Sequence, residues 1–376
     1  MSRMIITGGK VLSNAALREA DVGIADGLLA PPDDGRRFDA RGLLVLPGIV
    51  DLHGDAFERQ IQPRPGVAFD TGLAMVETER QLLGCGITTA FHGVTLSWEP
   101  GLRSIEAWRA MLAALATRRW TCDMRVHLRW EAFNLEALDE VMADVEAGRV
   151  HLVAFNDHMA SILKKLGNPI EGAKYAGRAG MGSGAFQALA EETASRAEEV
   201  PAALDRLAAL CRAKGLPMAS HDDDSIAMRQ EFSSRGAGIC EFPITEEVGI
   251  YARAQGDAVV MGSPNVVRGG SHLGWASAAD LAERGICSVL TSDYYYPCLL
   301  NAPFVLLERG KLDFAAAWAL VSTNPAAAAG LADRGRIEDG LRADLVIVDP
   351  DNRDPVATIV GGSIAYLSAE GASRLA

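Results

Sequence analysis

The sequence predicts a parallel (β/α)8 barrel that carries a small β-sandwich built from both ends of the chain. Apolar strand candidates alternate with amphipathic helical stretches through the middle of the 376 residues, as in barrels of this kind. Short strand-like runs separated by Gly and Pro turns recur at both ends, which is typical of a small β-sandwich. We therefore expect residues 1–46 and 335–376 to form the sandwich and residues 47–334 to form the barrel.

Each expected barrel strand is an apolar run, and most of these runs end in polar residues. In chain order they are Val45–His53, Ile87–Gly93, Met124–Glu131, His151–His158, Pro217–His221, Gly238–Ile244, Val259–Val267 and Ile286–Asp293. Helices are expected over Arg103–Trp120, over Leu135–Val145 with Asn134 as N-cap, over 185–213 with a break at Pro201, and over Ser277–Gly285 with a serine cap.

Composition limits the class of protein. A net charge of −13 argues against general binding of nucleic acid or of an anionic membrane, although a few local Arg or Lys residues can still bind an anionic substrate. The six Cys form no Cys-x-x-Cys pair, and the N-terminus has no secretory signal pattern. No apolar run reaches the roughly 18 residues of a membrane span. We expect a soluble cytoplasmic enzyme and leave open whether it forms a homo-oligomer.

The segment His53-Gly54-Asp55 is the most informative short motif. It directly follows an apolar run, and residues i and i+2 of a strand point to the same face. Further His residues stand at or near the ends of the next strand candidates: His92, His127, His158 and His221. Strand ends are semi-polar and attract single histidines, but five joined by carboxylates favour a site at the C-terminal ends of barrel strands.

Three other segments add candidate groups. His127, Arg129 and Glu131 share one face of their strand, where unpaired charges are costly and a metal or anion would neutralise them. The alternative is that Arg129 and Glu131 pair only with each other. Asp293, at the end of the last expected strand, can bind a metal and accept the proton of an attacking water. The Gly-rich segment 262–272 can offer backbone N–H groups to phosphate, or be merely a turn.

In order, the chain contains HGDAFERQ, PRPGV, HLRWE, NDH, ASHDD, EFPIT, MGSPNVVRGGSH and TSDYYYP. Together these motifs resemble the amidohydrolase superfamily and, within it, the triphosphate diphosphatases of phosphonate degradation. The resemblance implies cleavage of α-D-ribose 1-methylphosphonate 5-triphosphate between its α and β phosphates, with release of pyrophosphate. It also implies metal ligation by His53, Asp55, Glu131, His158, His221 and Asp293, and we infer that Glu131 bridges.

The expected cofactor is one or two divalent ions, Zn²⁺ first. Asp55 stands where the superfamily commonly has a second His, so the harder ions Mn²⁺ or Fe²⁺ are also compatible. The metal would activate water, with Asp293 as the catalytic proton acceptor. The expected phosphate-binding residues are Arg129 and Arg268, with His272, Arg59, Arg64, Lys164 and Lys165. The two lysines are equally explained as a solvated helix face.

Two stretches depart from the family pattern, 159–165 and 273–275, and they indicate a close paralogue with altered specificity as an alternative. A second alternative is a deacylase or cyclic-amide hydrolase with the same metal centre. A third is a non-catalytic scaffold in a phosphonate-processing complex, which would have no need for so many buried polar groups.

Overall fold

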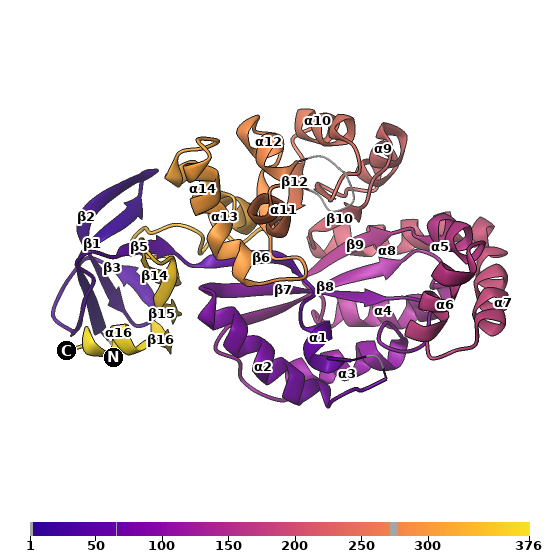
Figure 1. The fold of residues 1–376 in the computed structure, drawn as a ribbon, viewed down its shortest axis with the longest axis horizontal. Helices are drawn as coiled ribbons and strands as arrows, with labels where there is room; N and C mark the ends of the chain where they lie inside the picture. The colour runs from indigo at the N-terminus through magenta and orange to yellow at the C-terminus, as the bar shows by residue number, and fades with distance from the viewer. Residues whose placement is uncertain (1–2, 65, 271–276) are drawn as a thin grey trace.

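The computed structural model describes residues 3–64, 66–270 and 277–376. It consists of a parallel barrel and a separate sheet that packs against one end of the barrel (Figure 1). The fold class expected from the sequence is therefore confirmed, whereas the domain boundaries after residues 46 and 334 stay predictions. None of the helices in the described part is long and apolar enough to cross a membrane.

The barrel strands pair in chain order, each parallel to the next. They are β6 (Ile49–Gly54), β7 (Ile87–Leu96), β8 (Asp123–Glu131), β9 (Leu152–Asn156), β10 (Met218–His221), β11 (Ile239–Glu241), β12 (Ala258–Gly262) and β13 (Val289–Thr291). A parallel bridge between Gly54 and Asp293 joins the last strand to the first. Because all strands run the same way, their C-terminal ends meet at one mouth.

Helices surround the barrel strands (Figure 1). After β6 come α1 (Glu58–Ile61) and α2 (Thr71–Gly84), and after β7 comes α3 (Ile105–Ala116). After β8 come η1 (Leu135–Ala137) and α4 (Leu138–Glu146). The longest connection, after β9, contains α5 (Met159–Leu166), α6 (Pro169–Arg178), α7 (Ser183–Ala194), η2 (Ala197–Glu199) and α8 (Val200–Lys214). Then follow α9 (Ile226–Ser234), α10 (Glu246–Ala254), α11 (Ser263–Arg268), α12 (Ala278–Glu283), α13 (Pro297–Glu308), α14 (Phe314–Ala319) and α15 (Thr323–Ala328).

Side-chain caps fix where several of these helices begin. Asp70, Ser104, Ser225 and Thr245 each accept a hydrogen bond from the backbone N–H three residues later. Ser277 caps α12 in the same way, as the sequence predicts.

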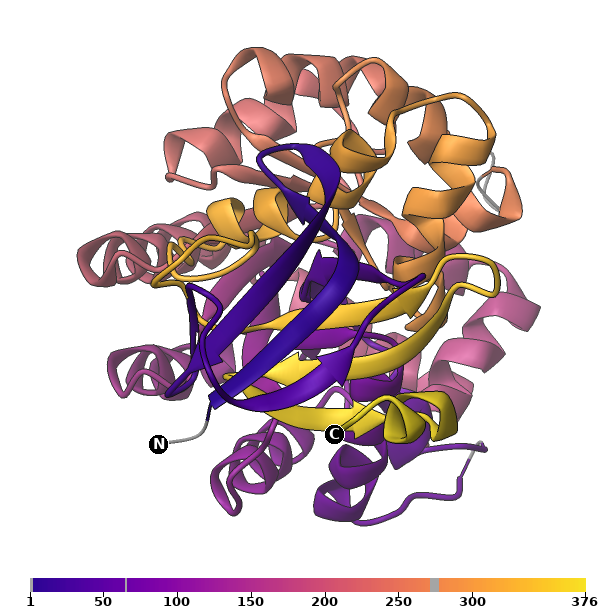
Figure 2. The ribbon, with the colours of Figure 1, turned by 90° about the vertical axis from the view of Figure 1, so that its left-hand side faces the viewer.

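The second sheet contains strands from both ends of the chain: β1 (Arg3–Ser13), β2 (Ala16–Ala25), β3 (Leu28–Ala30), β4 (Arg36–Asp39), β5 (Leu44–Pro47), β14 (Leu345–Asp349), β15 (Asp354–Val360) and β16 (Ser363–Leu367). The two ends meet where β14 pairs antiparallel with β5. The short helix α16 (Ala369–Ser373) closes the chain. Figure 2 shows this sheet in front of the barrel, which it covers at the end where β6 begins. The metal-binding candidates lie at the opposite end of the strands.

Four details of the sequence prediction are wrong. Val45–His53 is not one strand: Leu44–Pro47 belongs to the terminal sheet and Ile49–Gly54 to the barrel. The chain changes sheet at Gly48, where a Cβ atom would lie 2.4 Å from Oγ1 of Thr88. Val259–Val267 stops as a strand at Gly262, and the Gly-rich segment opens as helix α11 rather than as a loop. The helix after β8 starts with a 3₁₀ turn, and the Asn134 side chain makes no cap hydrogen bond.

Candidate metal centre

The barrel mouth brings together polar side chains from six strand ends. His53 is the second-last residue of β6, His221 ends β10, and Glu241 ends β11. Glu131 ends β8, while His158 and Asp293 follow β9 and β13 by two residues each. His53, Glu131, His221 and Glu241 are buried. All of these side chains except Glu241 are ones that the sequence singles out, and their binding of a common metal stays a prediction.

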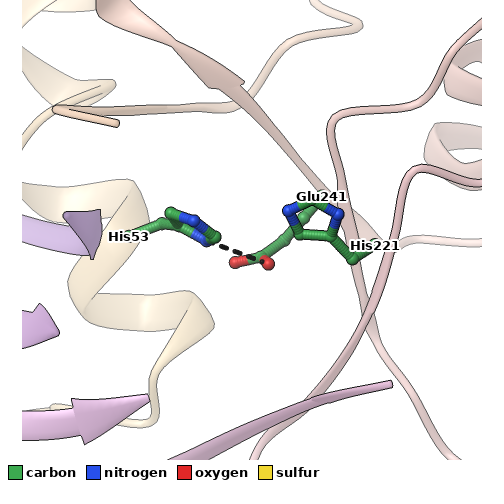
Figure 3. Close-up of side chains that lie close together, drawn as sticks. All are labelled: His53, His221 and Glu241. Atoms are coloured by element: carbon green, nitrogen blue, oxygen red, sulfur yellow. Dashed lines mark hydrogen bonds and ion pairs between the residues drawn. The ribbon is translucent and has the colours of Figure 1, made fainter. Parts of the chain in front are cut away.

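The first compact group is His53, His221 and Glu241. One ligand atom from each lies within 4.8 Å of the others. Nδ1 of His53 lies 3.2 Å from Oε2 of Glu241, and the two imidazole centres are 5.4 Å apart. Figure 3 shows the carboxylate of Glu241 between the two rings. The other carboxylate oxygen, Oε1, is buried and has no hydrogen-bond partner in the described part of the chain.

The second group shares His221 and adds His158 and Asp222, again with ligand atoms within 4.8 Å of one another. His158 lies between two carboxylates: its Nδ1 is 2.6 Å from Glu131 and its Nε2 is 3.3 Å from Asp222. The other oxygen of Asp222 lies 3.3 Å from Nδ1 of His221. Asp222 itself has a φ of +58°, a left-handed conformation that Asp tolerates better than most residues.

Asp293 and Asp55 complete the mouth on the β6 side. The backbone N–H of Asp293 donates to the carbonyl of His53 at 2.9 Å, and the N–H of Asp55 donates to the carbonyl of Asp293 at 3.0 Å. Below them, Asp51 is buried and accepts hydrogen bonds from the Thr291 and Ser292 side chains. These contacts hold β6 to the segment after β13, so the position of Asp293 is tied to that of His53.

The mouth holds its ionisable groups in different states. Burial lowers the pKa of His53 well below its usual value and lowers that of His127 to about 3, so both rings are neutral and can act as nitrogen ligands. Burial also acts on His158, but Glu131 and Asp222 outweigh it and raise the pKa of His158 to about 9. Burial, reinforced by the charge of Asp55, raises the pKa of Asp293 to about 7.

The residues present fit a divalent metal ion. Neutral imidazoles and carboxylates are the ligands that Zn²⁺ and similar ions prefer. Two acceptor atoms of this region are buried without a hydrogen-bond partner in the described residues, namely Oε1 of Glu241 and Nε2 of His127. Such atoms are costly to bury, and a cation at the mouth would offset part of that cost electrostatically.

Arg129 has partners that differ from those weighed in the sequence. Its Nη2 donates to Nε2 of His221 at 3.0 Å, and its Nη1 lies 3.7 Å from Asp55. Glu131 contacts His158 instead. The alternative in which Arg129 and Glu131 pair only with each other is therefore wrong.

The other predicted phosphate-binding residues are more peripheral. Arg59 and Arg268 are exposed and both contact Tyr294, which follows Asp293: the Arg59 guanidinium lies 5.7 Å from the ring centre, and Arg268 donates to the hydroxyl at 3.3 Å. Lys164 and Lys165 are exposed in the last turn of α5, and Lys165 donates to Tyr175. Arg64 is exposed in the turn after α1. His272 and residues 273–275 lie outside the described residues.

Three residues of this mouth are not among those expected from the sequence. Glu241 lies in the middle of the expected strand Gly238–Ile244, so a position at a strand end does not single it out. Asp222 directly follows His221 and contacts both His221 and His158. Arg103 lies near Glu131 and Asp55, with its Nε 3.8 Å from Glu58, whereas the sequence predicts it only as the start of a helix.

A parallel barrel with histidines and carboxylates at its C-terminal strand ends defines the class of metal-dependent barrel hydrolases. A family model described as "Amidohydrolase family" matches residues 291–366. α-D-Ribose 1-methylphosphonate 5-triphosphate diphosphatase of Escherichia coli (strain K12) is 34% identical over 318 residues, covering 82% of this chain and 84% of that protein. The chain thus belongs to the amidohydrolase family and, within it, to the family of this diphosphatase.

More distant similarities agree in fold. Allantoinase of Solibacter usitatus is 30% identical over 160 residues, covering 41% of this chain and 32% of that protein. Among solved structures, β-aspartyl dipeptidase of Fervidobacterium islandicum superposes with a TM-score of 0.63 at 14% identity, covering 97% of this chain and 96% of the other. Dihydropyrimidinase of Brevibacillus agri gives 0.61 at 15% identity, with 97% and 95% covered. At such identities the structural matches show the fold alone.

Proposed function

We propose that this hydrolase cleaves the triphosphate of α-D-ribose 1-methylphosphonate 5-triphosphate, releasing pyrophosphate during phosphonate degradation in the cytoplasm. The observation that carries the proposal is the 34% identity to the E. coli diphosphatase across 84% of its length. The barrel supports hydrolysis in general but not this substrate, because the same fold serves many reactions.

The proposed metal ligands are His53, Asp55, Glu131, His158, His221 and Asp293, with Zn²⁺ as the first choice of ion. When bound, the ion would supply Lewis-acid activation of water and of a phosphoryl oxygen. Asp293 would accept the proton of the attacking water. Its raised pKa, about 7, suits a group that takes up a proton near neutral pH.

Cations at the mouth support a phosphorylated substrate. Arg129 is buried among candidate ligands, while Arg59 and Arg268 are exposed and contact Tyr294, the residue that follows Asp293. Guanidinium groups bind phosphate oxygens with two parallel hydrogen bonds, so we assign the α phosphate to Arg129 and the departing diphosphate to the Tyr294 pair.

A deacylase or cyclic-amide hydrolase remains the second candidate. The observation that favours it is the 30% identity to allantoinase of Solibacter usitatus over 160 residues. A cavity of about 560 Å³ beside the loops after β7 and β8 is lined by both acidic and basic side chains, Glu99 and Arg109 among them, and does not distinguish the two substrates.

Product analysis separates these functions. The metal-loaded protein would be incubated with ribosyl and nucleoside 5′-triphosphates and with N-acyl and cyclic-amide substrates, and pyrophosphate and orthophosphate would be measured separately. We expect pyrophosphate, and none after removal of the metal. Hydrolysis of an amide with no triphosphate turnover would establish the second candidate, and no turnover at all would favour the scaffold.

A further inference from the structure

Glu241 makes a hydrogen bond across the inside of the barrel. It ends β11, which is not a neighbour of β6 in the strand order, yet its Oε2 lies 3.2 Å from Nδ1 of His53 on β6. Both side chains are almost completely buried, at 0% and 1% exposed. A contact between a carboxylate and an imidazole therefore crosses the inside of the barrel, and Figure 3 marks it with a dashed line.

His127 is another imidazole near the carboxylate of Glu241, and its position shows whether His53 or His127 donates the hydrogen bond. His127 on β8 lies edge-on to His53, with ring centres 5.0 Å apart. Its Nδ1 contacts the carbonyl of Leu52 at 2.9 Å, and a carbonyl can only accept, so Nδ1 of His127 carries its proton. Its Nε2 is 3.6 Å from Oε2 of Glu241, beyond hydrogen-bonding distance. His53 is thus the imidazole that donates to Glu241.

The contact determines which nitrogen of His53 is available to a metal. With the carboxylate oxygen of Glu241 as acceptor, Nδ1 of His53 carries the proton of this hydrogen bond and Nε2 carries the lone pair. Nε2 lies on the β7 side of the mouth, 3.2 Å from the position that a Cβ atom on Gly93 would take. Glycine at 93 leaves room for this ring orientation.

We infer that Glu241 is a positioning residue: it accepts the Nδ1 proton of His53 and thereby fixes Nε2 as the metal-binding atom. Carboxylates in this outer position commonly orient metal-binding histidines and raise their basicity. Glu241 would then act through His53 rather than bind the ion itself. This inference rests on the metal dependence in the proposed function, and not on the identity of the substrate.

The test is Glu241→Gln in the Zn²⁺-loaded protein, because a glutamine carbonyl can still accept from Nδ1 but carries no charge. We expect the Zn²⁺ affinity of one site to fall by about 10–100-fold, measured in competition with a chromogenic chelator. The number of Zn²⁺ ions bound per chain should not change. In ¹⁵N-histidine NMR, the Nδ1-protonated tautomer of His53 should persist in Glu241→Gln and be lost in Glu241→Leu.

The matched control is Glu79→Gln. Glu79 is another buried glutamate, and it accepts from the backbone N–H groups of Thr121 and Cys122 away from the mouth. Its substitution should leave Zn²⁺ affinity unchanged. Circular dichroism would verify that each variant is folded, and Glu241→Asp is the alternative should Glu241→Leu not fold.

Three results would overturn the inference. Loss of Zn²⁺ binding by more than 10³-fold in folded Glu241→Gln would make Glu241 a direct ligand. A Zn²⁺ affinity of Glu241→Gln within twofold of the wild type would show that Glu241 has no role in positioning His53. An Nε2-protonated His53 in the wild type would contradict the tautomer. Wild-type protein that binds no divalent ion would instead remove the metal dependence of the proposed function.

Discussion

Arg129 donates a hydrogen bond from Nη2 to Nε2 of His221, 3.0 Å away, inside the cluster of candidate metal ligands. A guanidinium does not lose its proton in proteins, so Nε2 of His221 is the acceptor and its lone pair faces Arg129. A metal ion that uses this nitrogen must displace the guanidinium. The displaced group would remain at the mouth, where it can contact an anionic substrate.

This relationship predicts that Arg129→Met tightens Zn²⁺ binding by about tenfold, or roughly 1.4 kcal/mol, because a competing cation is removed. Turnover of a triphosphate should fall in the same variant, since the cation also serves the phosphate. Arg129→Lys keeps the charge and should stay near the wild-type affinity. Chelator competition measures the effect, and weaker Zn²⁺ binding by Arg129→Met would contradict it.

Asp293→Asn should lose about 10²–10⁴-fold in turnover while it keeps most of the metal, because an amide cannot accept the proton of water. The backbone favours this substitution: Asp293 has a φ of +56°, and Asn tolerates this left-handed region. Asp26→Asn, at a φ of +51° in a distant turn, is the matched control. Steady-state kinetics and metal analysis check it. A variant that has lost its metal would show that Asp293 serves mainly as a ligand.

The raised pKa of His158 predicts how the free energy of unfolding of the metal-free protein changes with pH. Its folded-state pKa of about 9 lies above the ordinary value of 6.5, so it stabilises the fold fully below about pH 6.5. That stability, at most roughly 3 kcal/mol, should be lost as pH rises through 9. Urea unfolding of chelator-treated protein between pH 6 and 10 measures the slope, which His158→Gln should flatten. An equal slope in the variant would show that other groups cause it.

The geometry of parallel strands explains which residues of this site could be predicted from the sequence and which could not. Strand ends converge in a parallel barrel, so His53 and His221 could be placed at one mouth from apolar runs alone. Glu241 could not, because β11 has only three residues and alternation over so short a strand does not reveal which side chains face inward. The partners of Arg129 depend on side-chain reach across the barrel, which no spacing encodes.

The errors in the fold have similar causes. Residues 44–54 are apolar almost throughout and buried on both faces, so no periodicity marks the change of sheet at Gly48. The feature that requires glycine at position 48 is the close approach of the Thr88 side chain. The start of α11 did have a signal, because Pro264 stands in its first turn, where proline is favoured.

The carboxylate of Asp55, as a proposed ligand, predicts which metal ions support activity. A carboxylate in place of a second imidazole is a harder ligand, so the protein should be active with Mn²⁺ or Fe²⁺ as well as with Zn²⁺. Reconstitution of the metal-free protein with each ion, followed by activity measurement, checks this. Asp55→His should shift the preference toward Zn²⁺. Activity with Zn²⁺ alone in the wild type would be evidence against Asp55 as a ligand.

The last prediction concerns the leaving group. Arg268 and Arg59 both contact Tyr294, next to Asp293, and we assign this pair to the departing diphosphate. Arg268→Ala should therefore lower kcat/KM for a triphosphate. The expected loss of transition-state stabilisation is roughly 1.5–3 kcal/mol, the scale of a hydrogen bond to a charged group. Tyr294→Phe removes the hydroxyl that Arg268 contacts and keeps the ring beside Arg59, so it should cost less. Arg206→Ala, an exposed arginine on α8 that pairs with Asp139, is the control. Because the assigned phosphates leave with the product, pyrophosphate should inhibit the wild type more strongly than Arg268→Ala. Equal inhibition of both would place the diphosphate elsewhere at the mouth.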